Sequence, residues 1–194
     1  RRQRQMCIRD SIGGTGSGKS SLVNLIPRLY DATQGEVLVD GVNVKDYDIE
    51  ALRNKVGIVM QKAVLFKGTI RENMWMGKKG ATDEQIDEAL EISQSKEFVD
   101  SKQGRLDYVI EQGGKNLSGG QRQRLTIARA IVRKPDVLIL DDSASALDFA
   151  TDAALRKAIR GMNNSPTVFI VSQRAASLMS VSYTHLTLPT KLEV

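Results

Sequence analysis

The stretch IGGTGSGKSSLVNLIPRLY, residues 12–30, decides the fold of this chain. An apolar residue, Ile12, precedes a glycine-rich run, and an apolar pattern with helical spacing follows it. The run GGTGSGKS, residues 13–20, fits G-x-x-x-x-G-K-[ST], in which backbone N–H groups converge on phosphate oxygens at the start of a helix. Pro27 and the turn-forming residues after it predict the end of that helix. The stretch therefore predicts a phosphate loop that follows the apolar Ile12 and opens a helix.

Two residues of this loop have specific expected roles. Lys19 is expected to reach the β- and γ-phosphates of a nucleotide, and the Ser20 hydroxyl is expected to bind Mg²⁺. A glycine-rich turn that only opens a helix is the alternative, and Ile12 before the motif and the helical pattern after it argue against it. The expected nucleotide-binding residues are Gly13, Gly14, Thr15, Gly16, Ser17, Gly18, Lys19 and Ser20.

Downstream of the loop, apolar runs of strand length alternate with helical patterns. EVLVD and GVNV around Asp40–Gly41 predict a hairpin, IEALRNK a short helix and VGIV a buried strand. VLIL, residues 137–140, and TVFIV, residues 167–171, predict two more buried strands with a helix at about residues 151–162 between them. Residues 62–132 are expected to be mostly helical, with a glycine-rich break at QGGKNLSGG. This alternation predicts a parallel α/β sheet.

The run VLILDD, residues 137–142, ends a predicted strand with two acids. A phosphate loop works with a carboxylate that holds Mg²⁺ at the end of such a strand. We therefore expect Asp141 to bind the metal and Asp142, one residue further, to act as the base that orients the attacking water. A buried strand that simply ends in a turn is the alternative.

The run LSGGQ, residues 117–121, opens another predicted helix. Ser118 and Gln121 have the spacing of a capping box, which would explain these two residues structurally. It does not explain Gly119 and Gly120, because a glycine in a helix costs up to about 1 kcal/mol relative to alanine. Bare backbone at a helix N-terminus suits a close approach to phosphate. The further nucleotide-binding residues expected here are Ser118, Gly119, Gly120 and Gln121.

Taken in order along the chain, these motifs resemble the nucleotide-binding domain of ABC transporters. The matching segments are the phosphate loop at 13–20, Gln61 after VGIVM, NLSGGQRQR at 116–124, VLILDD at 137–142 and SALD at 145–148. LFKGTIREN, residues 65–73, is similar to the exporter-type branch of the family. Together the segments are highly specific, and the resemblance covers residues 12–179 or so.

The resemblance implies a P-loop NTPase (RecA-like) fold of the α/β class, truncated at both ends. A parallel sheet core over residues 12–62 and 133–180 would carry an inserted helical subdomain over residues 63–132. The cofactors would be ATP and Mg²⁺, with Gln61 touching Mg²⁺ or the water. A second ABC nucleotide-binding domain would pair head to tail with this one, so that each ATP lies between one phosphate loop and the other LSGGQ, while residues 145–148 cross the interface. A transmembrane domain of the same full-length chain would hold the assembly at the cytoplasmic face of the plasma membrane.

Two positions depart from the family pattern. Asp142 stands where glutamate is usual, and Gln173 stands where a histidine is usual. The shorter aspartate withdraws its carboxylate by more than about 1 Å, and a misplacement of that size can cost about 10²-fold in rate. Glutamine still donates a hydrogen bond but cannot hold a proton. The pair resembles the degenerate subunit of a heterodimeric exporter, with Asp142, Gln173 and Gln61 at a slow catalytic site; drift within a fully active enzyme is the alternative.

The two ends of the chain can be one DNA sequence read from opposite strands. RRQRQMCIRD, residues 1–10, can be encoded by DNA whose reverse complement encodes VSYTHLTLPT, residues 181–190, and this DNA resembles a sequencing adaptor. We therefore expect residues 1–11 and 181–194 to be a non-native head and tail, with Met6–Asp10 able to pair as a makeshift strand. The head carries four arginines, so most of the net charge of +5 belongs to non-native residues. The remaining chain is only weakly basic, and no nucleic-acid partner is expected.

Composition and the remaining motifs help to decide between the alternative functions. A hydrophobic content of 41% and a charged content of 26% are typical of a globular domain. A soluble ABC-type ATPase acting on DNA or ribosomes would predict strong basic patches and long coiled-coil insertions, which the sequence lacks. A small-molecule kinase has no use for a partner-facing LSGGQ. A fragment that binds nothing would show no nucleotide-dependent thermal shift.

Overall fold

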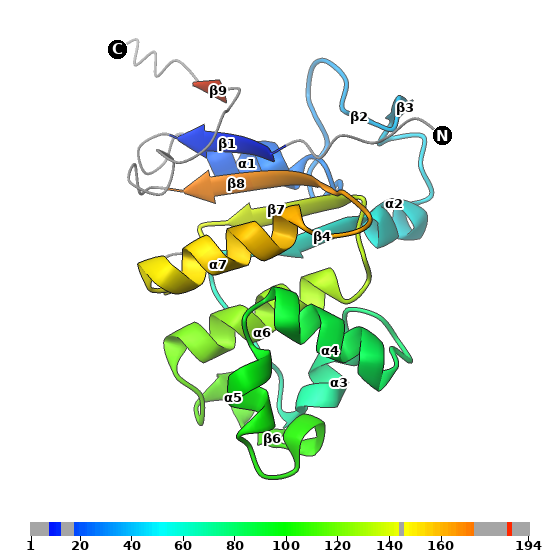
Figure 1. Ribbon diagram of the computed structural model, residues 1–194. Helices are drawn as coiled ribbons and strands as arrows, with labels where there is room; N and C mark the ends of the chain where they lie inside the picture. The colour runs from blue at the N-terminus through cyan, green and yellow to red at the C-terminus, as the bar shows by residue number, and fades with distance from the viewer. Residues whose placement is uncertain (1–7, 13–17, 144–145, 173–185, 188–194) are drawn as a thin grey trace.

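A five-stranded parallel sheet forms the centre of the computed structural model, which describes residues 8–12, 18–143, 146–172 and 186–187. The strands are β1 (Ile8–Ile12), β4 (Val56–Val59), β7 (Val137–Asp141), β8 (Thr167–Ser172) and β9 (Leu186–Thr187). They lie in the order β4-β7-β8-β1-β9, and every neighbouring pair is parallel (Figure 1). The parallel sheet predicted from the sequence is confirmed. β1 includes three residues, 8–10, of the stretch expected to pair as a makeshift strand.

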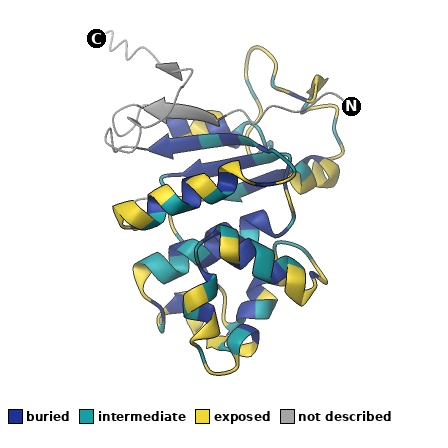
Figure 2. Ribbon diagram, in the orientation of Figure 1, coloured by how far each residue is buried: buried dark blue, intermediate teal, exposed yellow. Residues whose placement is uncertain are grey.

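The central strands are covered on both faces, which explains their uninterrupted apolar runs. On one face, β7 and β8 contribute Leu138, Leu140 and Val168 to a large core shared with α6 (Gly119–Ile131) and α7 (Phe149–Arg160). On the other face, Ile139 packs with Val23 of α1 (Lys19–Asn24). Figure 2 shows the described part of the sheet as mostly buried. Each fully buried aliphatic side chain of this kind stabilises the fold by about 1.5–3 kcal/mol.

Between β4 and β7 the chain builds a separate helical lobe, seen below the sheet in Figure 1. Its helices are α3 (Ile70–Trp75), α4 (Asp83–Ile92), α5 (Lys96–Asp100) and α6, with short 3₁₀ turns at Arg105–Asp107 and Gln112–Gly114. The mostly helical character predicted for this region is confirmed. The sequence analysis missed the antiparallel pair of β5 (Gly68–Thr69) and β6 (Val109–Ile110), because strands of two residues carry no readable alternation.

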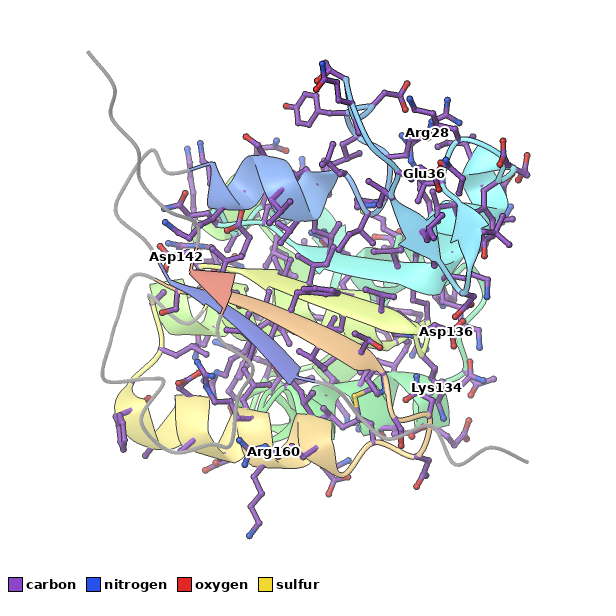
Figure 3. The ribbon with its side chains drawn as sticks, turned by 90° about the horizontal axis from the view of Figure 1, so that it is seen from above. Arg28, Glu36, Lys134, Asp136, Asp142 and Arg160 are labelled. Atoms are coloured by element: carbon purple, nitrogen blue, oxygen red, sulfur yellow. The ribbon has the colours of Figure 1, made fainter. Side chains whose placement is uncertain are left out.

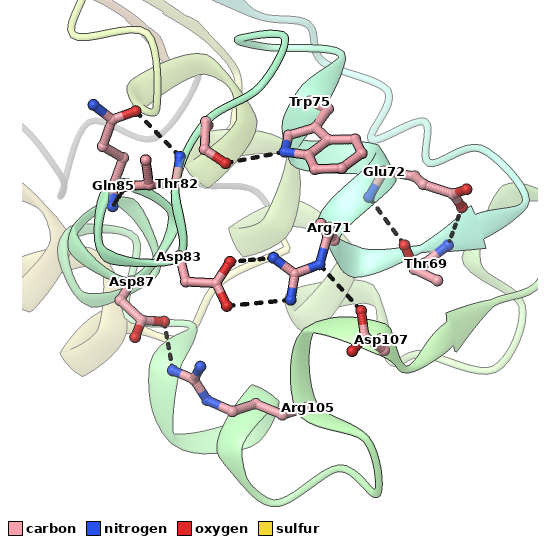
Figure 4. A network of polar contacts seen from close by, with 11 residues as sticks. Thr69, Arg71, Glu72, Trp75, Thr82, Asp83, Gln85, Asp87, Arg105 and Asp107 are labelled. Carbon is pink, nitrogen blue, oxygen red and sulfur yellow. Dashed lines mark hydrogen bonds and ion pairs between the residues drawn. The ribbon is translucent and has the colours of Figure 1, made fainter.

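Two arginines tie the elements of the helical lobe together (Figure 4). Arg71 of α3 pairs with Asp83 at the start of α4 and with Asp107, whose Oδ1 lies 3.1 Å from Arg71 Nε. Arg105 pairs in the same way with Asp87 of α4 and Asp100 of α5. The hydrogen bond from Arg71 lowers the pKa of the Asp83 carboxyl below its usual value. Ion pairs therefore connect the elements of the helical lobe, in addition to the packing of its apolar core.

The segment between α1 and β4 forms the predicted hairpin and helix. β2 (Leu38–Val39) and β3 (Val42–Asn43) pair across Asp40–Gly41, whose φ angles of 51° and 80° match a two-residue hairpin turn of the primed type. α2 spans Ile49–Lys55, as predicted. The helix after the phosphate loop ends earlier than its apolar pattern indicates, at Asn24 rather than at Pro27. Among the described residues, no helix combines the length and the apolar character that crossing a membrane requires.

Candidate nucleotide-binding site

Three of the predicted catalytic and metal-binding residues lie at the carboxyl ends of parallel strands, where open α/β sheets bind their ligands. Gln61 follows β4 by two residues, Asp141 is the last residue of β7, and Asp142 comes directly after it. Because β4 and β7 are adjacent and parallel, these residues meet at one edge of the sheet. Figure 3 shows Asp142 at the end toward which the arrow of β8 points.

Gln61 and Asp142, which are 81 residues apart in sequence, are joined by a hydrogen bond. The Gln61 Nε2 group donates to Asp142 Oδ2 at 3.2 Å. Asp142 has a φ of 45°, in the left-handed region, and its backbone N–H donates to the Val171 carbonyl at 2.9 Å. The backbone thus continues the pairing of β7 with β8 while the side chain turns toward Gln61. The structure brings together two of the three predicted catalytic residues, and the third, Gln173, lies outside the described residues.

The phosphate loop lies partly outside the described residues, which include Gly18, Lys19 and Ser20 but not residues 13–17. Gly18 has φ 78° and ψ 8°, a left-handed conformation that favours glycine, and α1 begins directly after it. Lys19 is only 7% exposed, which is unusual for a lysine, while Ser20 is exposed. The predicted turn from loop into helix is therefore formed at the described end of the motif.

The residues expected to hold Mg²⁺ offer a suitable set of donors. Ser20, Gln61 and Asp141 supply a hydroxyl, an amide oxygen and a carboxylate, which are the hard oxygen ligands that Mg²⁺ prefers. Asp141 is 5% exposed and is fixed by its place at the end of a central strand. The donor chemistry at this sheet edge fits the metal that the sequence predicts.

The LSGGQ segment forms the capping box that the sequence analysis gave as its structural alternative. Ser118 Oγ accepts a hydrogen bond from the Gln121 backbone N–H at 3.2 Å, and Gln121 Oε1 accepts one from the Ser118 N–H at 3.0 Å. The two glycines differ in their surroundings. A Cβ at Gly120 would lie 3.3 Å from the Ala146 carbonyl, whereas a Cβ at Gly119 would meet only Arg122 Nη2, at 3.9 Å. Gly120 therefore has a packing role, and Gly119 leaves bare backbone with free space beside it.

The stretch SALD at 145–148 is described from Ala146 onward. Asp148 caps α7, because its Oδ1 accepts from the Thr151 N–H at 2.9 Å and its Oδ2 accepts from the Thr151 hydroxyl at 2.7 Å. The backbone hydrogen bond from Thr151 lowers the pKa of this carboxyl. Ala146 lies against the start of α6, so this segment and LSGGQ share one surface.

Sequence reasoning missed a hollow beside this site. Its wall is formed by the loop after β4, the loop before α6 and the first turn of α6, and it includes Gln61, Lys115, Gly119 and Gln123. The sequence signal for this hollow was Lys115, a basic residue between Gly113–Gly114 and LSGGQ. A single lysine matches no binding motif, so it did not reveal the hollow.

Comparisons with known proteins agree with this geometry. The model of the ABC transporter family matches residues 10–145. The chain is 41% identical over 167 residues to YwjA of Bacillus subtilis, an uncharacterized ABC transporter ATP-binding protein, and 40% identical over 167 residues to a Staphylococcus aureus protein named "Putative multidrug export ATP-binding/permease protein". Each match covers 86% of this chain and 29% of the relative, so the chain spans less than a third of the length of these relatives.

The solved structure of a bacterial Atm1-family ABC exporter with ATP bound superposes with a TM-score of 0.84 and 31% identity, covering 90% of this chain and 31% of that one. The chain belongs to the ABC transporter family and is one of its ATP-binding domains, with the parallel P-loop NTPase core and helical insertion that the sequence predicts.

Proposed function

We propose that this chain is the ATP-hydrolysing motor domain of an ABC exporter, which drives transport of a substrate across a membrane. The observation that carries the proposal is the meeting of Gln61 and Asp142 at the carboxyl edge of the sheet, beside a buried Asp141. The printed names of an ATP-binding/permease relative and of an exporter structure support the exporter assignment.

Each residue of the site has a role in the proposed reaction. Lys19 and the phosphate loop would hold the phosphates of ATP, and Ser20, Gln61 and Asp141 would hold Mg²⁺, which would supply positive charge against the phosphates. Asp142 orients the attacking water, and Gln61 fixes the direction of the Asp142 carboxylate through their hydrogen bond.

We infer that this site turns over slowly in a heterodimer with a second ABC nucleotide-binding domain. Asp142 is one methylene shorter than glutamate, and its Oδ2 already accepts a hydrogen bond from Gln61, which occupies one of the acceptor positions that would otherwise face the water. Gln173 cannot hold a proton at the position where the family pattern has histidine. The LSGGQ segment is intact, with Gly119 open to solvent, and it would complete the ATP site of the partner domain.

A groove between β4 and α6 supports a membrane-embedded partner. It is lined by Ile58, Phe66, Met76 and Arg129, and the side chains of Phe66 and Met76 are 48% and 51% exposed. Large apolar side chains gathered in one groove mark a surface that another element covers. We propose that a cytoplasmic segment of the transmembrane domain of the full-length chain packs here, and that this domain lies at the cytoplasmic face of the plasma membrane.

ATP binding is tested by thermal unfolding of the full-length transporter with and without Mg-ATP. A ligand present at 100 times its Kd stabilises the native state by about 2.7 kcal/mol, so the melting temperature is expected to rise clearly. Because the partner domain would bind ATP as well, the comparison is made with the partner's phosphate loop disabled; there Lys19→Ala is expected to remove the shift, and Lys157→Gln on the exposed face of α7 is expected to keep it. Equal shifts in wild type and Lys19→Ala would refute binding at the phosphate loop.

The asymmetry is tested by single-site turnover in the full heterodimer. Removing the catalytic carboxylate of the partner domain is expected to abolish most hydrolysis, whereas Asp142→Asn is expected to lower it only slightly. If the two changes lower hydrolysis equally, the slow-site proposal is wrong.

A further inference from the structure

The hollow beside LSGGQ has a strongly cationic wall. It lies between the loop after β4 and the start of α6, and its positive side chains are Lys62, Lys115 and Arg122. No carboxylate is among the described residues that line it. Lys62 and Lys115 are exposed, and within the described ranges neither makes a hydrogen bond or an ion pair. Three cations without a facing carboxylate favour an anionic occupant.

Arg122 is held in place by backbone rather than by a counter-charge. Its Nη1 donates to the Leu117 carbonyl at 2.7 Å and to the Gly114 carbonyl at 3.3 Å. Gly114 is needed for this arrangement, because a Cβ there would lie 2.7 Å from Arg122 Cδ. Gly113 and Gly114 have φ angles of 71° and 70°, which curl the loop back toward the helix. The positive charge of Arg122 thus stays beside the hollow without neutralisation by a carboxylate.

A buried amide in the same wall has no partner. Gln123 is only 2% exposed, and its Nε2 group makes no hydrogen bond. A buried donor without an acceptor costs about 1–3 kcal/mol, so such groups in native proteins commonly meet a ligand or a water. Gly119 adds backbone at the N-terminus of the 13-residue helix α6, where the helix dipole favours negative charge.

We propose that this hollow binds an inorganic phosphate ion. Lys62, Lys115 and the Gln123 amide are the donors, and Arg122 contributes its field. The hollow borders Gln61 on one side and Gly119 on the other, so it adjoins both the ATP site of this domain and the one that LSGGQ faces. A phosphate ion freed by hydrolysis can therefore be held here before it reaches solvent. Only the source of the ion rests on the proposed function; its binding depends on the residues of the hollow alone.

Direct binding of inorganic phosphate to the nucleotide-free, full-length transporter tests the proposal. The measurement is titration calorimetry or ³¹P line broadening in a background in which Lys19 and the phosphate-loop lysine of the partner domain are both changed to alanine, which removes phosphate binding at the two phosphate loops. The Lys62→Gln/Lys115→Gln pair is expected to weaken the remaining binding by at least about tenfold, since each lost charge-assisted contact is worth more than a neutral hydrogen bond. Gln123→Leu is expected to weaken it by about three- to tenfold.

A matched control separates a site from general attraction. Lys79→Gln/Lys157→Gln removes two exposed positive charges elsewhere and is expected to change phosphate affinity by less than about twofold, because screening limits distant charges. Equal affinity in the Lys62/Lys115 pair and in this control, or no binding in the background without the two phosphate-loop lysines, would overturn the proposal. Phosphate binding without any ATP hydrolysis would leave the hollow as a phosphate site and refute the proposed function instead.

Discussion

At the level of single residues, the proposed ATP hydrolysis depends most on the position of the Asp142 carboxylate. Its left-handed backbone, its N–H bond to Val171 and its contact with Gln61 fix where the carboxylate lies. The sequence predicted a role for Asp142 from its place after a buried strand, and the resemblance to ABC nucleotide-binding domains implied that Gln61 belongs to the same site. Neither predicted their direct hydrogen bond, because the separation of two side chains depends on strand register and backbone conformation.

Lengthening the Asp142 side chain is expected to restore activity to this site. Asp142→Glu adds one methylene and moves the carboxylate toward the attacking water by about 1 Å, a displacement that can be worth up to about 10²-fold. We expect single-site hydrolysis to rise by about tenfold or more in the heterodimer. Asp142→Asn, which keeps the length but removes the charge, is the matched control and is expected to show no rise. An Asp142→Glu variant with wild-type turnover would show that carboxylate reach does not limit this site.

At the level of elements, local sequence signals predicted most of the secondary structure. The hairpin at Asp40–Gly41 and the helix IEALRNK follow from turn chemistry and apolar spacing, and both are present. The packing role of Gly120 was not predictable, because it depends on Ala146, which approaches from the far end of β7. The pair of β5 and β6 was missed for a similar reason, since only tertiary contacts hold such short strands together.

Ser118 caps α6, and we propose that it also faces a phosphate of the partner site; two substitutions separate these roles. Aspartate caps helices about as well as serine, so Ser118→Asp is expected to keep the stability of the domain. It places a negative charge where a phosphate should approach, and we therefore expect it to abolish ATP-driven pairing with the second domain. Ser118→Ala is expected to cost about 1 kcal/mol of stability through loss of the cap. The measurements are urea unfolding and ATP-dependent dimer formation, and normal pairing of Ser118→Asp would contradict the role of LSGGQ in binding phosphate.

At the scale of the whole molecule, the charged bracing of the helical lobe predicts sensitivity to acid. The lowered pKa of Asp83 means that its pairing with Arg71 stabilises the fold fully above the aspartate pKa of the unfolded chain, about 3.9. This stabilisation is lost as the pH falls through the lower pKa of the folded state. We expect the free energy of unfolding in urea to decline below about pH 4, with a smaller decline in Arg71→Met. Arg28→Met, which removes a surface pair with Asp31 outside the lobe, is expected to decline like wild type.

In the proposed function, the groove between β4 and α6 would connect the sheet and the helical lobe to the transmembrane domain. Arg129 of α6 lies over the Phe66 ring, 5.8 Å from its centroid, and donates to the Val64 carbonyl at 2.9 Å. The loop that follows Gln61 is thereby attached to the helix that begins with LSGGQ. A segment of the transmembrane domain packed in the groove would touch both, so its movement could reach the catalytic edge of the sheet and the partner-facing helix together.

Met76 offers a direct test of this link, because its side chain is 51% exposed and lines the groove without belonging to the ATP site. Met76→Gln keeps the length of the side chain and removes its apolar surface, so we expect stability to change by less than about 0.5 kcal/mol. In the full-length transporter, ATP-driven transport is expected to fall several-fold if the proposed contact with the transmembrane domain is made here, because the substitution weakens it. Val109→Gln, at a 55% exposed position on β6 outside the groove, is the control and is expected to transport normally. Equal transport by the two variants would place the membrane partner on another face of the domain.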